Sequence, residues 1–162
     1  MAKLYINKGE IKKMIRRKIK KLNESPSKEM YRYEPNAYPR KSFYGKAKVV
    51  EYLIESDDRK DGFYRLELLR SYDTWVMAKL TSLKDNQYIY VANYRYSSPS
   101  NTTIRHIYSF SKMYTAAYRK LPVSKELANL GYGTPSNYEL QRLLDEMLQI
   151  AKDEGMDISY GV

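Results

Sequence analysis

The strongest hydrophobic pattern of the chain lies near its C-terminus. Apolar residues recur there every three or four positions, which is the spacing of one face of a helix. They are Leu140, Leu143, Leu144, Met147, Leu148 and Ala151. Ser136 and Glu139 precede them in the arrangement of a capping box, and Gly155 follows them as a stop signal. The pattern predicts a helix over residues 137–154.

Two further helical segments precede this one. Apolar residues recur at helical spacing after Thr102 and Thr103, either of which can cap a helix, and the pattern reaches about Lys120. A shorter helix is expected near residues 125–130, where Gly131 ends it. The second half of the chain is therefore predicted to be mainly helical.

The middle of the chain has the pattern of strands, and its runs are separated by turn residues. The four runs cover residues 47–55, 63–70, 72–80 and 87–95. Short connections favour an antiparallel meander. In the last run, Tyr88, Tyr90, Ala92 and Tyr94 share one face of the predicted sheet. That face is a stacking platform if it is open, and it is core if a helix covers it.

The first part of the chain shows a helical pattern with a basic opposite face. Asn7 and Glu10 match a helix cap, and apolar residues then recur at helical spacing between Ile11 and Leu22. The pattern predicts a helix over residues 8–22. Its other face carries Lys12, Lys13, Arg16, Arg17, Lys20 and Lys21. The predicted fold is therefore α+β, with a basic N-terminal helix, a four-stranded antiparallel sheet and C-terminal helices.

Residues 25–42 contain three prolines and three tyrosines and are expected to form an extended loop. Cations are interleaved with the rings, at Lys28, Arg32, Arg40 and Lys41. Such a composition is typical of a segment that follows a single nucleic-acid strand, in which cations meet phosphates and rings meet bases. A surface loop pinned by its tyrosines is the alternative.

The positive charge of the chain is concentrated in its first third. Residues 1–48 contain 15 Lys and Arg against 4 Asp and Glu, whereas residues 49–162 contain 14 against 15. A region of one sign is typical of a surface that docks a polyanion. We therefore divide the chain into a basic arm, residues 1–48, and an α+β domain, residues 49–162. The residues expected to contact nucleic acid are Lys12, Lys13, Arg16, Arg17, Lys20, Lys21, Arg32, Arg40 and Lys41.

The remaining composition excludes several classes of protein. The chain has no Cys and a single His, which excludes disulfide scaffolds, thiol nucleophiles and the usual zinc and iron–sulfur sites. We expect no bound metal and no cofactor. No apolar segment typical of a secretion signal follows Met1, and no stretch reaches membrane-spanning length. The protein is therefore expected in the cytoplasm of its host, without membrane contact.

Two short segments form a motif pair. The first reads Ser71-Tyr72-Asp73-Thr74-x-Val76-x-Ala78, and the second reads Tyr96-Ser97 and then Thr102-Thr103-x-Arg105-His106-Ile107. The pair resembles the motifs of a domain of unknown function in small phage, plasmid and other mobile-element proteins of bacteria, where Asn is usual at the position of Asp73. The resemblance implies a phage or mobile-element origin and brings no established activity.

The second motif places hydroxyls and a cation at an expected helix N-terminus. Thr102, Thr103 and Arg105 would then form a phosphate or anion site, because free backbone N–H groups favour negative charge there. His106 either hydrogen-bonds within the fold or takes part in catalysis. In the catalytic alternative, His106 is the general acid or base, Arg105 or a lysine stabilises the phosphate, and Tyr96 or Ser97 positions the ribose hydroxyl.

These features favour a phage-encoded protein that binds RNA or DNA, or a host ribonucleoprotein nuclease. The resemblance suggests that it inhibits an RNA-guided host defence, as an anti-CRISPR protein does. A metal-independent ribonuclease that acts on structured RNA through His106 is the first alternative, with binding favoured over catalysis. A protein-only inhibitor or structural phage component, with the helix over residues 137–154 as its interface, is the second.

Overall fold

The computed structural model describes residues 17–25, 46–56, 63–131 and 133–156 of the 162-residue chain. Its strands are β1 (Arg17–Ser25), β2 (Ala47–Ser56), β3 (Phe63–Ser71), β4 (Thr74–Ser82), β5 (Tyr88–Asn93) and β6 (Val123–Ser124). Its helices are α2 (Asn101–Ser111), α3 (Thr115–Arg119), α4 (Lys125–Ala128) and α5 (Asn137–Asp153). The α+β class predicted from the sequence is confirmed.

All six strands belong to one sheet, in the order β1-β2-β3-β4-β5-β6. The first five are antiparallel neighbours, and β6 pairs parallel with the end of β5. The predicted antiparallel meander is therefore confirmed, and the sheet has an additional strand at each edge. The turn between β3 and β4 consists of Tyr72 and Asp73. It lies at the same end of the sheet as the start of β2 and the end of β5.

Residues 17–25 form strand β1, where the sequence predicted a helix. β1 pairs antiparallel with β2, and Ile19 packs against the main core. The helix predicted over residues 8–22 is therefore wrong from Arg17 onward, and its earlier residues lie outside the described part of the chain. Pairing covers an edge of β2, and this tertiary contact outweighs a weak local helical preference. The boundary predicted after residue 48 falls inside β2, so the predicted arm shares the sheet.

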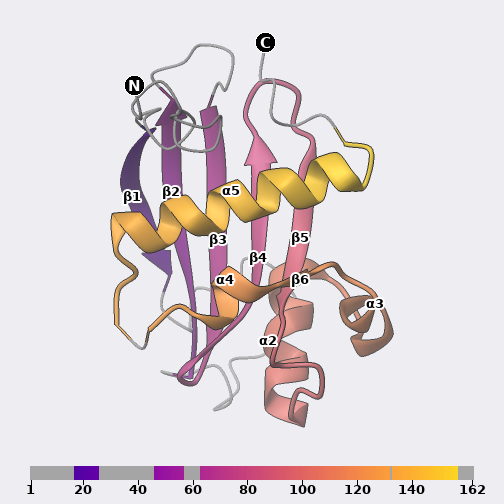
Figure 1. Cartoon of the computed structure of the whole chain (residues 1–162). Coiled ribbons are helices and arrows are strands. Elements are labelled where there is room, and N and C mark those ends of the chain that lie inside the picture. Colours follow the sequence, from indigo (N-terminus) through magenta and orange to yellow (C-terminus); the bar gives the residue numbers. More distant parts are fainter. Residues whose placement is uncertain (1–16, 26–45, 57–62, 132, 157–162) are drawn as a thin grey trace, which may run out of the picture.

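Helix α5 lies across one face of the sheet (Figure 1). Its buried side chains pack with those of the central strands, and the cluster includes Leu143, Leu144 and Met147 of α5 and Leu66 and Leu68 of β3. Burying one such side chain contributes about 1.5–3 kcal/mol relative to leaving it exposed. The predicted capping box of α5 is confirmed, because the side chains of Ser136 and Glu139 bond each other's backbone N–H groups at 3.1 and 3.0 Å.

Helices α2 and α3 pack on the opposite face, over the end of the sheet that carries the β3–β4 turn. Tyr88 and Tyr90 of β5 lie on this face and are only partly covered, and Tyr94 follows the end of the strand. Tyr88 and Tyr94 are exposed, whereas Tyr90 is half-buried, with its ring 6.2 Å from that of Phe110. Burial raises the pKa of Tyr90 to about 12, and the carboxylate of Glu67 adds to this rise. The face is therefore core at one end and partly open at the other.

Helix α2 is capped two or three residues earlier than predicted and is shorter. The Ser100 hydroxyl accepts a hydrogen bond from the Thr103 N–H at 3.2 Å, so neither Thr102 nor Thr103 is the N-cap. At the other end, Lys112 adopts a left-handed conformation with φ of 62° and ends the helix. The single helix predicted to reach Lys120 is therefore wrong, because the chain turns at Lys112 before it continues as α3.

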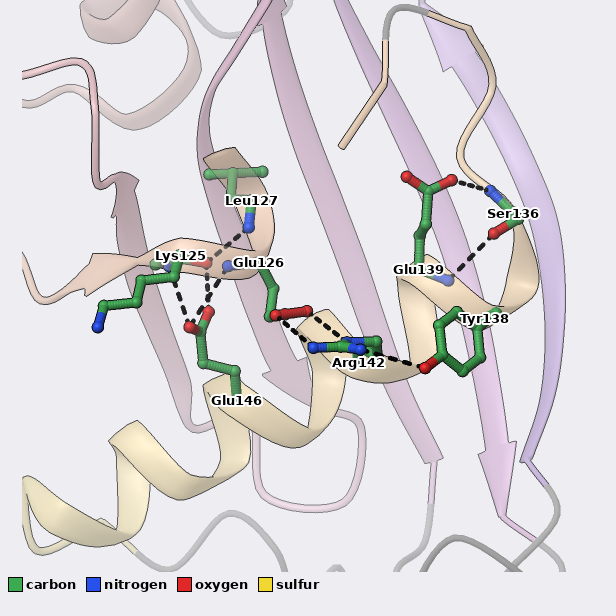
Figure 2. A network of polar contacts seen from close by, with 9 residues as sticks. Lys125, Glu126, Leu127, Ser136, Tyr138, Glu139, Arg142 and Glu146 are labelled. Atoms are coloured by element: carbon green, nitrogen blue, oxygen red, sulfur yellow. Dashed lines mark hydrogen bonds and ion pairs between the residues drawn. The ribbon is translucent and has the colours of Figure 1, made fainter. Parts of the chain in front are cut away.

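A carboxylate of α5 caps the short helix α4 (Figure 2). Glu146 accepts hydrogen bonds from the Ser124 hydroxyl and from the backbone N–H groups of Lys125, at 3.0 Å, and Glu126, at 3.4 Å. One turn earlier on α5, Arg142 donates to both carboxylate oxygens of Glu126, at 2.8 and 3.2 Å. These contacts hold α4 and the end of β6 against α5.

Candidate functional site

The two motif segments meet where the end of β3 packs against the first turns of α2. The hydroxyl of Ser71 lies 2.7 Å from Nδ1 of His106 and 2.9 Å from the hydroxyl of Thr103. All three side chains are buried, and His106 and Thr103 are 0% exposed. The hydroxyls of Ser100 and Tyr96 extend the network, at 3.2 and 3.3 Å from that of Thr103. The motif residues therefore join the sheet to the helix through one hydrogen-bonded network.

This network brings together three of the predicted site residues, Tyr96, Thr103 and His106. Arg105 is exposed, and Thr102 is half-buried. Because His106 has no exposed surface, a phosphate reaches its ring only if α2 moves. The hydroxyl and N–H of Thr103 are bonded within the protein. The geometry is that of a packed contact between sheet and helix, in which the predicted catalytic and anion-binding residues do not together line one open site.

The loop that carries Tyr96 is held from two sides. The amide of Asn93 donates to the carbonyl of Trp75 at 2.7 Å, and its oxygen accepts from the N–H of Arg95 at 2.8 Å. The hydroxyl of Tyr118 lies 2.7 Å from the carbonyl of Tyr96. Burial raises the pKa of Tyr118, so this hydroxyl keeps its proton and remains a donor. The segment after β5 is therefore fixed beside the β3–β4 turn.

The predicted nucleic-acid contacts fall into two groups. Three of them, Arg17, Lys20 and Lys21, belong to β1. Because these three residues belong to a strand, they are not part of the predicted cationic helix face. The others, Lys12, Lys13, Arg16, Arg32, Arg40 and Lys41, lie outside the described residues. Their contact with nucleic acid stays a prediction.

A basic cleft of about 200 Å³ lies beside the β3–β4 turn. We call it the Lys48 cleft, and it is lined by Lys46, Ala47, Lys48, Arg70, Tyr72 and Asp73. The register of the sheet places Lys48 of β2 directly opposite Arg70 of β3. Like charges in directly opposed positions destabilise a strand pair. The two cations therefore give this wall of the cleft a positive charge, which favours an anion.

The guanidinium of Arg70 is fixed by the turn itself. Its Nε donates to the carbonyl of Tyr72 at 3.1 Å, and one terminal nitrogen lies 3.4 Å from the carboxylate of Asp73. Its central carbon lies 5.5 Å from the centroid of the Trp75 ring. Such exposed ion pairs contribute about 0–1 kcal/mol. Their main effect here is therefore to hold a positive charge at one position on the wall of the cleft.

Tyr72 occupies an unfavourable backbone conformation in this turn. Its φ is 54°, in the left-handed region that favours glycine, and a side chain there costs about 1–2 kcal/mol. Its N–H donates to the carbonyl of Lys46 at 2.6 Å, which fixes the turn against the start of β2. The residue is 48% exposed. The ring is therefore about half open to solvent next to the cations of the Lys48 cleft, and its centroid lies 6.1 Å from that of the His106 ring.

A second cleft, of about 260 Å³, lies on the other side of the turn. We call it the Arg95 cleft, and it is lined by Asp73, Thr74, Trp75, Asn93, Arg95, Tyr96, Leu127, Ala128 and Leu130. A narrower depression, lined in part by Lys48, Arg70 and Trp75, shares residues with both clefts. The β3–β4 turn is thus flanked by recesses on two sides, and Asp73 lines both of the larger ones.

The clefts were not predicted from the sequence, although some of their residues belong to patterns that the sequence analysis described. Lys46 and Lys48 belong to the basic first 48 residues, and Tyr72 belongs to the first motif. Within the described ranges, no three carboxylate or His side chains gather as metal ligands. None of the described helices is long and apolar enough to cross a membrane.

Comparison with known proteins places these segments in a family. Residues 31–126 match the model of a family of unknown function, DUF8033, which covers more than half of the chain. The match includes both motif segments and the strands β3 and β4 on either side of the β3–β4 turn. A search of curated proteins and a search of solved structures find no match. The chain therefore belongs to the DUF8033 family of unknown function.

Proposed function

We propose that this protein binds nucleic acid at the end of its sheet that carries the Lys48 cleft. The observation that carries the proposal is the opposed pair of Lys48 and Arg70 beside the exposed ring of Tyr72. Cations that are held close together lower the energy of a phosphate between them, and an exposed ring offers a surface on which a base stacks.

The topology adds to this argument. The chain leaves β1 at Ser25 and enters β2 at Ala47, and both positions lie at the end of the sheet that carries the Lys48 cleft. The basic segment over residues 26–45, with its predicted contacts Arg32, Arg40 and Lys41, is therefore attached at this end. A basic segment and a basic cleft at the same end of the sheet both favour the binding of one nucleic-acid strand there.

Salt dependence of binding tests the proposal. A labelled single-stranded RNA is titrated with the protein at several salt concentrations, and the affinity is measured by fluorescence anisotropy. The test variant is the double substitution Lys46→Ala and Lys48→Ala. The matched control is Lys84→Ala with Lys152→Ala, which removes the same charge from exposed positions in the β4–β5 turn and in α5.

Each phosphate contact on a single strand contributes about 0.7 to the slope of log affinity against log salt. The test variant should therefore bind more weakly, with a slope shallower by about 1.4, while the control keeps the wild-type slope. Binding that is absent from the wild-type protein would contradict the proposal. So would an unchanged slope in the test variant.

A narrower role follows from the resemblance to phage and plasmid proteins. In this role the protein inhibits an RNA-guided host defence by occupying guide RNA or the nucleic-acid channel of a nuclease. Capture of partners from a bacterial host, with and without nuclease treatment, tests it. A partner lost on nuclease treatment supports an RNA-dependent complex, whereas a retained partner supports a protein-only inhibitor.

A further inference from the structure

The turn between β3 and β4 carries a carboxylate in otherwise positive surroundings. Among the described residues that line the Lys48 and Arg95 clefts, Asp73 supplies the one carboxylate. The charged groups around it are those of Lys46, Lys48, Arg70 and Arg95. A carboxylate repels phosphate, so Asp73 weakens any site whose task is only to hold a nucleic-acid backbone.

The position of Asp73 suits the recognition of a base. Its side chain is 79% exposed, so it is available to a ligand, and Arg70 restrains it through the contact at 3.4 Å. An ionised carboxylate is an acceptor with two oxygens. It therefore favours a ligand that presents two neighbouring N–H donors.

The Arg95 cleft provides the rest of a base-sized recess. Ala128 and Leu130, which are half-buried, supply an apolar surface, and Arg95 supplies hydrogen-bond donors. At about 260 Å³ the cleft is slightly smaller than the pockets of about 300–1,000 Å³ that hold drug-sized ligands. A single planar base is the part of a nucleic acid that fits a recess of this size and polarity.

Guanine is the base whose hydrogen-bonding edge matches these groups. Its Watson–Crick edge has an acceptor, O6, followed by two donors, N1–H and the N2 amino group. Asp73 can accept from the two donors, and Arg95 can donate to O6, as Arg commonly does in guanine recognition. Adenine, cytosine and uracil do not offer two adjacent donors on this edge.

We infer that the Arg95 cleft binds one unpaired guanine of a single-stranded nucleic acid, with Asp73 as the residue that determines base specificity. The inference rests on the proposed function, since the phosphates of the same strand lie on Lys46 and Lys48. An unpaired base is required, because a duplex hides this edge in its base pairs.

Oligonucleotides with one variable base test the inference. The probes are an all-uracil strand and the same strand with one central guanine, inosine, adenine or cytosine, each as RNA and as DNA. Inosine keeps O6 and N1–H but lacks the N2 amino group, so it removes one of the two donors. The variants are Asp73→Ala and Asp73→Asn, with Asp85→Asn in the β4–β5 turn at the opposite end of the sheet as the matched control.

The wild-type protein and Asp85→Asn should bind the guanine probe about 5- to 150-fold more tightly than the all-uracil probe, the range of one bidentate base contact. Inosine should lose most of this preference. Asp73→Ala and Asp73→Asn should bind all probes alike and keep the wild-type salt dependence, because the lysines remain. Melting temperatures verify that the variants are folded.

The outcomes separate the inference from the proposed function. Wild-type protein that binds every probe equally, or a folded Asp73→Ala variant that keeps the guanine preference, overturns the inference and leaves nucleic-acid binding in place. Wild-type protein that binds no probe overturns both.

Discussion

Ser71→Ala removes the hydroxyl that joins the end of β3 to α2. Nδ1 of His106, at 2.7 Å, and the hydroxyl of Thr103, at 2.9 Å, then each lose one partner in the buried network. Thr103 keeps its contacts with Ser100 and Tyr96, so the loss falls mainly on the ring nitrogen. A buried polar group that lacks a partner costs about 1–3 kcal/mol. We expect the free energy of unfolding to fall by about 2 kcal/mol.

Urea denaturation measures this loss, and thermal unfolding should show a melting temperature lower by about 4–8 °C for a chain of this size. Ser98→Ala is the matched control, because Ser98 is exposed in the loop before α2 and its loss should change stability by less than about 0.5 kcal/mol. Thr103→Val keeps the shape of the side chain without its hydroxyl. Combined with Ser71→Ala, it should cost less than the sum of the two single substitutions.

A Ser71→Ala variant as stable as Ser98→Ala would refute the structural account of this network, and so would costs that add. A catalytic role for His106 has a separate signature. If the wild-type protein cleaves structured RNA in excess chelator and a folded His106→Gln variant does not, the ring acts in catalysis and α2 must move to expose it.

Three further predictions concern other groups of the fold. Glu146→Ala should lower the free energy of unfolding by about 1–3 kcal/mol in urea denaturation, because it removes the carboxylate that accepts from the backbone N–H groups of Lys125 and Glu126 at the start of α4. Glu146→Gln should cost less. Equal stability of all three proteins would contradict this prediction. The hydrogen bond from the backbone N–H of Ser136 is the main cause that lowers the pKa of Glu139, so the stabilisation that the Glu139 carboxylate gives is present above the usual carboxyl pKa and is lost as the pH falls through the lowered value. The difference in unfolding free energy between wild type and Glu139→Gln should therefore shrink in acid. A constant difference would count against the capping box. The raised pKa of Tyr90 favours the neutral hydroxyl, so the contribution of this hydroxyl to stability is present below pH 10 and is lost as the pH rises to about 12. The difference in near-ultraviolet absorbance between wild type and Tyr90→Phe should therefore titrate near pH 12. Titration near pH 10 would show that the ring is open to water.

Helix α5 could be predicted from the sequence because its signals are local. The cap at Ser136 and the apolar period that follows it act within a few residues of each other, and the structure reproduces both. The strands β2 to β5 were predicted for the same reason, since each combines alternation with a nearby turn. Their antiparallel order followed from the short connections.

Strand β1 and the end of α2 could not be predicted in this way. Residues 17–25 contain too few apolar positions to distinguish a helix from a strand, and the decision comes from pairing with β2, about 30 residues later in the chain. The break at Lys112 has no glycine or proline to announce it. Its left-handed conformation is stabilised by a backbone bond from its N–H to the carbonyl of Tyr108.

The motif residues were identified from the sequence, but their roles depended on burial. His106 was open to either a structural or a catalytic interpretation, and its burial follows from the packing of α2 on the end of β3, where Ser71 lies 35 residues earlier in the chain. The clefts were not predicted at all. They depend on the register that sets Lys48 against Arg70 and on the loop that brings Arg95 beside Asp73.

Two unfavourable features meet at the β3–β4 turn. Tyr72 holds a left-handed conformation in which glycine would be cheaper, and Lys48 faces Arg70 across neighbouring strands. Asn86 and Lys112 also hold left-handed conformations, whereas at Tyr72 this cost coincides with the opposed cations. Backbone strain and repulsion that persist in an otherwise consistent fold are concentrated at sites where a ligand binds. A glycine at position 72 would therefore stabilise the free protein, and it would weaken the binding of nucleic acid because the ring is lost.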